Sequence, residues 1–109
     1  MRITFTARHF RPSERLKDHA HTEVLRLKKY YDGILDVEVV LDYVKQQQVA
    51  EILAKVYGTR LTVVEQSEDM YKSINLAVEK LERQLKKYKE KRKQFDKARI
   101  VEGIEIEEK

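Results

Sequence analysis

Polar and apolar residues alternate along two short stretches of this chain, residues 2–7 and 35–43, and each alternation predicts a β-strand. In residues 2–7, Ile3, Phe5 and Ala7 fall on one side of the chain, as in a half-buried strand. Two further stretches, residues 49–57 and 59–66, are rich in β-branched residues and also predict strands.

Turn residues separate the last three predicted strands. Gly58 divides the final two strands and indicates a hairpin. The run of glutamines at residues 46–48 is expected to form a polar turn before them. In residues 35–43, Val37 and Tyr43 are predicted on the buried face and Val40 on the opposite face.

Two longer stretches repeat their apolar residues with the period of an α-helix. The first is expected to begin at Ser13, a favourable N-cap, and to end at Asp32–Gly33. Its apolar face comprises Leu16, Ala20, Val24, Leu27 and Tyr31. The second covers residues 69–93, with Asp69 as N-cap, and its face comprises Met70, Ile74, Val78, Leu81, Leu85 and Tyr88.

The resulting order is β-α-β-β-β-α, which predicts an α+β fold in a single domain. Each helix has one apolar stripe, so the simplest packing is a four-stranded sheet with both helices on one face. The other sheet face is then left to solvent or to a partner. Residues 94–109 show no helical period, and we expect a folded domain over residues 1–93 followed by an acidic, flexible tail over 94–109.

Charge is unevenly distributed along the last predicted helix. Lys80, Arg83, Lys87 and Lys91 share one side of it, and residues 80–93 hold eight Lys or Arg side chains against two acids. Pairing along the helix cannot neutralise this segment. A solvated helix face is the common explanation of such a stripe, but the local excess favours a polyanionic partner.

Composition excludes several classes of protein. A chain of 109 residues with 41% hydrophobic residues and a net charge of +4 is expected to fold as one globule. It has no cysteine, which excludes disulfides and thiol chemistry and suits a reducing cytoplasm. No apolar run approaches the ~20 residues of a membrane span, and no signal-peptide core is visible. We expect a soluble, cytoplasmic protein without a membrane partner.

No constellation of catalytic or metal-binding residues stands out. His19 and His21 are two residues apart on a predicted helix and project about 200° apart, while His9 lies alone in a loop. The acid pair Glu68 and Asp69 is explained by the helix cap. The three glycines form no phosphate-binding loop. We expect no enzyme, no metal, no cofactor and no small-molecule substrate.

Several separated motifs resemble one known family. They are EDMY at residues 68–71, IN at 74–75, KLERQL at 80–85, LKDH at 16–19, KKYYD at 28–32 and VEVVL at 37–41. In order and spacing they are similar to the bacterial ribosome hibernation factors, the family of the short hibernation-promoting factor and protein Y (the ribosome-associated inhibitor). The resemblance covers residues 1–93, the whole predicted domain.

This resemblance implies a fold similar to a double-stranded-RNA-binding domain and a function without chemistry. The implied partners are the small (30S) ribosomal subunit, its 16S rRNA and the 70S ribosome. Binding over the mRNA and tRNA channel would block translation and keep ribosomes inactive in stress or stationary phase. Long relatives add a ribosome-dimerising domain, which has no counterpart in this sequence, so no dedicated dimerisation domain is expected.

The resemblance also implies which residues bind RNA. Lys80, Arg83 and Lys87 match basic positions of the family on the last helix, and Lys28 matches one on the first. Charge and helical geometry add five further candidates, Lys86, Lys89, Lys91, Arg26 and Lys29. Because both helices are expected on one sheet face, the bases of the two helices are predicted to converge, with Arg83 gripping a phosphate bidentately.

Aromatic residues and the open sheet face leave alternatives. Tyr30 and Tyr71 are candidates for stacking on RNA bases, whereas Tyr31 and Tyr88 align with the apolar stripes and are predicted at the edge of the core. A protein-interaction regulator of the sigma-54 modulation type, using the exposed sheet face, is an alternative function. A generic binder of double-stranded RNA is another.

Overall fold

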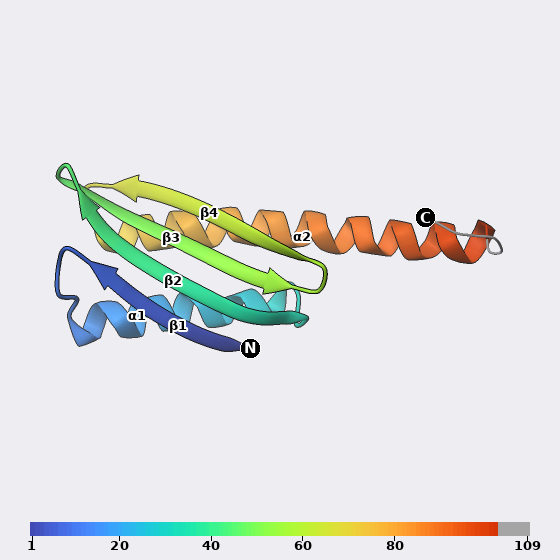
Figure 1. Cartoon of the computed structure of the whole chain (residues 1–109), viewed down its shortest axis with the longest axis horizontal. Coiled ribbons are helices and arrows are strands. Elements are labelled where there is room, and N and C mark those ends of the chain that lie inside the picture. The colour runs from blue at the N-terminus through green and yellow to red at the C-terminus, as the bar shows by residue number, and fades with distance from the viewer. Residues whose placement is uncertain (103–109) are drawn as a thin grey trace.

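The computed structural model describes the backbone of residues 1–102 and the side chains of residues 1–91. The predicted order of strands and helices is confirmed, with one added 3-10 turn, η1, after the first helix (Figure 1). The elements are β1 (Arg2–Arg8), α1 (Glu14–Leu25), η1 (Arg26–Lys29), β2 (Ile34–Val44), β3 (Gln47–Val56), β4 (Thr59–Ser67) and α2 (Met70–Glu102).

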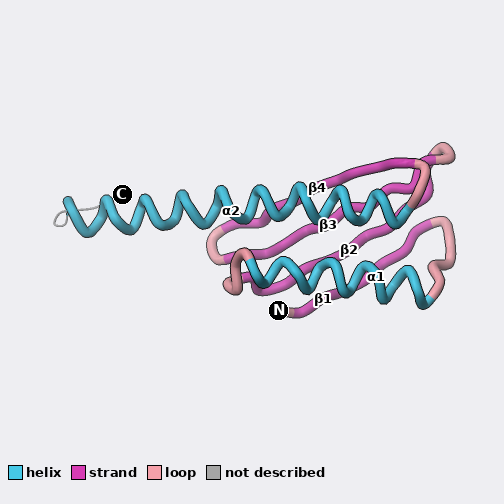
Figure 2. Tube along the Cα trace, turned by 180° about the vertical axis from the view of Figure 1, so that it is seen from behind, coloured by secondary structure: helices cyan, strands magenta, loops and turns pink. Residues whose placement is uncertain are grey.

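The four strands form one mixed sheet in the order β1-β2-β3-β4. β1 pairs with β2 in parallel, which requires the crossover that α1 provides. β2, β3 and β4 pair antiparallel through two tight turns. Seen from the helix side, α1 runs along β1 and β2 while α2 runs along β3 and β4 (Figure 2). The predicted layer of two helices on one sheet face is therefore confirmed.

The core lies between this sheet face and the two helices. Leu27 of η1, Leu41 of β2 and Ile74 of α2 are among its fully buried side chains. The predicted apolar stripe of α2 is buried from Met70 to Leu85, and Tyr88 packs at its edge. The C-terminal part of α2 extends beyond the sheet (Figure 1).

Side-chain hydrogen bonds confirm both predicted helix caps. The Ser13 hydroxyl accepts from the Leu16 amide at 3.1 Å, and the Asp69 carboxylate accepts from the Tyr71 amide at 3.1 Å. Within the core, the buried Ser73 hydroxyl donates to the Gln48 carbonyl of β3 at 2.7 Å. This bond fixes the first turn of α2 against the sheet.

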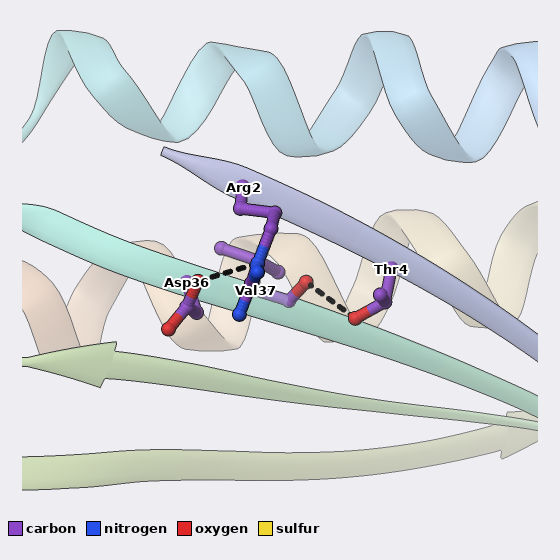
Figure 3. Close-up of polar contacts among 4 residues, drawn as sticks. All are labelled: Arg2, Thr4, Asp36 and Val37. Atoms are coloured by element: carbon purple, nitrogen blue, oxygen red, sulfur yellow. Dashed lines mark hydrogen bonds and ion pairs between the residues drawn. The ribbon is translucent and has the colours of Figure 1, made fainter.

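The opposite sheet face carries cross-strand polar contacts. Arg2 of β1 and Asp36 of β2 are register partners, and their side chains form an ion pair of 3.2 Å (Figure 3). Thr4 donates to the Val37 carbonyl at 3.4 Å beside them. Val64 is the most exposed large apolar side chain of β4. This open face therefore carries polar contacts between β1 and β2, where Arg2 and Asp36 pair opposite charges across the strands.

The prediction that the first helix continues to Asp32–Gly33 is wrong. α1 ends at Leu25, and η1 carries the chain on to Lys29. The Leu27 carbonyl then accepts from the amides of Tyr30 and Tyr31, at 3.0 and 3.2 Å. A Cβ atom on Gly33 would lie 2.5 Å from the Tyr31 ring. Glycine therefore lets the chain pass beneath that ring on its way into β2.

Two other boundaries and the burial of two side chains differ from the prediction. The turn between β2 and β3 is Lys45–Gln46, both with positive φ (49° and 67°), so Gln47 and Gln48 belong to β3. Tyr43 is 41% exposed, whereas Val40 on the open face is only 4% exposed. The predicted end of the last helix at residue 93 is wrong, since α2 continues to Glu102. The rest of the predicted tail, residues 103–109, lies outside the described residues.

Candidate nucleic-acid interface

Exposed bases follow α2 from its middle to the end of the described side chains. Within residues 1–91, five of the basic residues predicted to bind RNA are exposed and make no ion pair within 4.0 Å. They are Arg83, Lys86, Lys87, Lys89 and Lys91. Glu90 is the one acid between Arg83 and Lys91. This part of α2 therefore presents nearly uncompensated positive charge.

The first helical segment adds bases at the same level of the domain. Lys28 and Lys29 lie on η1 and are exposed. Arg26, at the start of η1, forms an ion pair of 3.0 Å with Glu23 of α1. Arg26 and Arg83 line the same groove between the helices. The predicted convergence of bases from both helices is thus found for Arg26 and Arg83.

Lys80 does not take part in this convergence. Its ammonium group lies 3.3 Å from the Glu65 carboxylate of β4, on the flank of α2 that faces away from α1. Lys80 and Lys86 are six residues apart and project about 120° from each other, and Lys86 lies against Tyr30 on the α1 side. Lys87, one heptad after Lys80, follows the Lys80 flank. The basic stripe therefore wraps around α2 and does not form a single row beside η1.

The groove between α1, η1 and α2 has a volume of about 450 Å³. Buried Leu27 and Val78 form its apolar floor. Besides the two arginines, its polar lining consists of Glu23, Tyr30, Asn75, Glu79 and Glu82. Sequence reasoning missed Glu79 and Glu82, because their position in one groove with Arg26 depends on how the two helices lie against each other.

Tyr30 is the aromatic residue of this groove. The Lys86 ammonium lies 5.0 Å from the centre of the Tyr30 ring, a cation–π contact. A hydrogen bond to the Glu82 carboxylate raises the pKa of the Tyr30 hydroxyl above its usual value of 10.0, and desolvation adds to this. The hydroxyl is therefore neutral at physiological pH. Stacking of Tyr30 on an RNA base stays a prediction.

The other tyrosines are divided between the core edge and the surface. Tyr31 and Tyr88 pack edge to face with ring centres 5.5 Å apart, which confirms their predicted place at the edge of the core. Tyr71 packs edge to face against His19 at 5.0 Å. Tyr57, in the β3–β4 turn, is 72% exposed, and its carbonyl accepts from the Tyr88 hydroxyl. Tyr57 directly precedes Gly58 in the sequence, and this turn position is the feature from which an exposed aromatic residue beside the basic helix could have been predicted.

His9 and His19 each make a contact to an element distant in sequence. His19 joins α1 to α2 through a hydrogen bond of 2.8 Å to Asn75. His9 lies 2.7 Å from Asp42 at the far end of the sheet. Across the described part of the chain, no group of three or more His, Asp or Glu residues is arranged to hold a metal ion. The same residues contain no helix long and apolar enough to cross a membrane.

Three comparisons relate this architecture to known proteins. Residues 3–93 match the family model described as Sigma 54 modulation protein / S30EA ribosomal protein. The ribosome hibernation promoting factor of Pseudomonas putida is 32% identical over 91 residues, which are 84% of this chain and 89% of that protein.

Solved structures agree with this match. The ribosomal subunit interface protein from Coxiella burnetii is similar with a TM-score of 0.78 and 28% identity, over 82% of this chain and 98% of that one. The N-terminal domain of Thermus thermophilus Protein Y gives a TM-score of 0.74 and 31% identity, over 81% and 99%. The α+β fold is that of these proteins, and the chain belongs to the Sigma 54 modulation protein / S30EA ribosomal protein family, as its motifs predicted.

Proposed function

We propose that this protein is a ribosome hibernation factor that binds the small (30S) subunit over the mRNA and tRNA channel, blocks translation and keeps ribosomes inactive. The names of its relatives support the ribosomal role. The observation that carries the binding mode is the set of exposed bases on α2 from Arg83 to Lys91, which make no ion pair among the described side chains, together with the exposed Lys28 and Lys29 of η1. Such a surface fits the phosphates of 16S rRNA.

The physical basis of this binding is the release of counterions. Each phosphate that a Lys or Arg neutralises frees condensed cations, so a surface with six or more bases binds RNA without reading its sequence. Arg83 holds a fork of donors that matches a phosphate in two places. Lys87, Lys89 and Lys91 act as mobile point charges along the same helix. The affinity should therefore fall steeply with salt.

Co-sedimentation with purified 30S subunits tests this proposal. Replacing Arg83 and Lys87 together by glutamate should abolish binding at moderate salt, because two attractive charges become repulsive. The matched control replaces Lys55 and Arg60 by glutamate. These two register partners project from the open sheet face, and the control makes the same change in net charge. Undiminished binding by the α2 variant would overturn the proposal.

The same assay separates the two alternatives. A regulator that acts through the open sheet face would lose its partner with the Lys55/Arg60 variant and keep it with the α2 variant. A generic double-stranded-RNA binder would bind bare duplexes as tightly as it binds 30S subunits. We expect the reverse pattern in both cases. Sedimentation of whole ribosomes also reports whether the protein holds single 70S particles or pairs them.

The proposal assigns ribosome binding to residues 1–93 and leaves 94–109 as an acidic tail outside the binding unit. Ribosome binding places the protein in the cytoplasm. No catalytic step, metal or cofactor is needed, because occupying the channel excludes mRNA and tRNA sterically. All nine predicted bases lie within residues 1–93, so deletion of residues 94–109 should leave 30S binding in place.

A further inference from the structure

The groove between α1, η1 and α2 holds charges that phosphate binding does not explain. Glu79 and Arg83 both line it, one helical turn apart on α2. Both are exposed, and within residues 1–91 neither makes an ion pair within 4.0 Å. The neighbouring groups are engaged, since Glu23 pairs with Arg26 and Glu82 holds Tyr30. The Glu79 carboxylate and the Arg83 guanidinium group therefore remain available to a ligand in this groove.

A sugar–phosphate backbone alone would fit this lining poorly. Glu23, Glu79 and Glu82 all face the groove, and carboxylates repel phosphate oxygens. A nucleotide has both kinds of edge, an anionic phosphate and a base whose N–H groups donate hydrogen bonds. Bases that leave the stack are recognised by aromatic rings and by hydrogen bonds to their Watson–Crick edges. The groove offers Tyr30 for the ring, Glu79 for the base edge and Arg83 for the phosphate.

The chemistry of Glu79 discriminates among the bases. A carboxylate only accepts hydrogen bonds. Guanine presents two adjacent donors, N1–H and N2–H, which one carboxylate can accept together. Adenine and cytosine present one amino group beside an acceptor nitrogen, and uracil presents one N–H between two carbonyl groups. Only guanine matches both carboxylate oxygens without an opposing acceptor.

We propose that the groove formed by Tyr30, Glu79 and Arg83 takes one unstacked guanosine nucleotide, with the base edge on Glu79 and its phosphate on Arg83. The volume of about 450 Å³ and the apolar floor of Leu27 and Val78 suit a single base with its ribose. The inference rests on the proposed RNA-binding function and deepens it, because it adds one sequence-selective contact to a surface that otherwise reads only charge.

Fluorescence anisotropy with labelled heptaribonucleotides tests the site. The three probes are uridine heptamers whose central base is guanine, adenine or uracil. Wild-type protein should bind the guanine probe about tenfold more tightly, the order expected of one bidentate side chain–base pair. Glu79→Gln should bring the three affinities close together, because an amide offers one acceptor where guanine needs two. Glu38→Gln, the same change at an exposed site on the open sheet face, should keep the preference.

A second variant separates stacking from base reading. Tyr30→Leu should weaken the binding of all three probes, since every base has a face that can stack on an aromatic ring. Equal binding of the three probes by the wild type, or a guanine preference that survives in Glu79→Gln, overturns the proposal. Guanosine monophosphate alone distinguishes two sources of the ligand. If guanosine monophosphate binds and Glu79→Gln abolishes that binding, the free nucleotide is sufficient. If only the heptamer binds, its flanking phosphates are necessary.

Failure of this inference and failure of the ribosomal function give different results. If the wild type co-sediments with 30S subunits but shows no guanine preference, the ribosomal function stands and the groove proposal falls. If it prefers the guanine probe but does not co-sediment, the groove proposal stands and the ribosomal function falls.

Discussion

The Lys80 ammonium of α2 lies 3.3 Å from the Glu65 carboxylate of β4, and this ion pair holds a base that the family resemblance assigned to RNA. Glu65 is only 29% exposed and belongs to the edge strand on the far side of α2 from α1. A phosphate that approaches Lys80 must therefore compete with a carboxylate already in place. Arg83, three residues later, has no such partner among the described side chains.

This difference predicts unequal effects for two single alanine variants in 30S binding. Arg83→Ala should weaken binding and lower the slope of log K against log salt by about one, the value for one lost phosphate contact. Lys80→Ala should change the slope by clearly less, because its charge is already compensated. Binding measured at four salt concentrations gives both slopes. Equal losses in slope for the two variants would show that Glu65 releases Lys80 on the ribosome.

A second prediction concerns the buried Ser73. Its hydroxyl donates to the Gln48 carbonyl and lies 2.7 Å from the Ser67 hydroxyl. Ser73→Ala removes the donor and leaves that carbonyl without its partner, so we expect a loss of about 1–3 kcal/mol in the free energy of unfolding. Urea unfolding followed by circular dichroism measures it.

The control for Ser73 is Thr22→Ala on the exposed face of α1, where the hydroxyl meets water. We expect its free energy of unfolding to change by less than about 0.5 kcal/mol. A Ser73→Ala protein as stable as the control would mean that the bond between α2 and β3 contributes nothing net to stability.

The fold was predictable wherever burial imposes a period on the sequence. Ile3 and Phe5 alternate with polar residues because β1 has one covered face, and Ile74 and Leu81 repeat because α2 lies on the sheet. The C-terminal part of α2 extends past the sheet and has no strand beneath it (Figure 1). The apolar period therefore stops, although Lys, Glu, Arg and Gln, all good helix formers, continue the helix to Glu102. The prediction from the apolar period alone therefore ended α2 too early.

The positive charge of the candidate site could be predicted from the sequence, but the partners of its charged side chains could not. Counting Lys and Arg in residues 80–93 identified the exposed bases of α2, since a local excess of charge cannot all be paired. The pair of Lys80 with Glu65 and the meeting of Arg26 with Glu79 in one groove depend on contacts between elements distant in sequence. No spacing along the chain encodes those contacts.

The turn between β2 and β3 offers a stabilising substitution. Lys45 and Gln46 both have positive φ, a conformation that costs a residue with a Cβ about 1–2 kcal/mol. In two-residue hairpin turns these two positions are usually occupied by Asn-Gly. Replacing both residues by Asn-Gly should raise the free energy of unfolding by about 1 kcal/mol. The midpoint of thermal unfolding measures the gain.

The opposite effect is expected at the next turn. Gly58 has φ +85°, and a Cβ atom added to it would have no neighbour within 4 Å, so Gly58→Ala meets backbone strain without a clash. It should lower the free energy of unfolding by about 1 kcal/mol. If neither turn variant changes stability, the backbone has relaxed to negative φ at these positions.

The contact between Asp42 and His9 makes part of the stability depend on pH. The hydrogen bond from His9 lowers the pKa of the Asp42 carboxyl, and the Tyr43 amide and Arg8 lower it further, against the opposing effect of desolvation. The folded pKa thus lies below the unfolded value of about 3.9. The contribution of Asp42 is fully present above pH 3.9 and is lost as the pH falls through the lower folded pKa.

Comparison of the wild type with Asp42→Asn between pH 2 and pH 6 tests this sign. The wild type should be the more stable of the two near pH 5, and the difference should disappear at the acid end, where the carboxyl is protonated in both the folded and unfolded states. His9→Gln removes the largest cause of the shift. In that variant the pKa of Asp42, followed by carboxyl carbon NMR, should move up toward 3.9 without reaching it, because the Tyr43 amide still donates. A pKa that does not move in His9→Gln would assign the whole shift to the Tyr43 amide and the Arg8 charge.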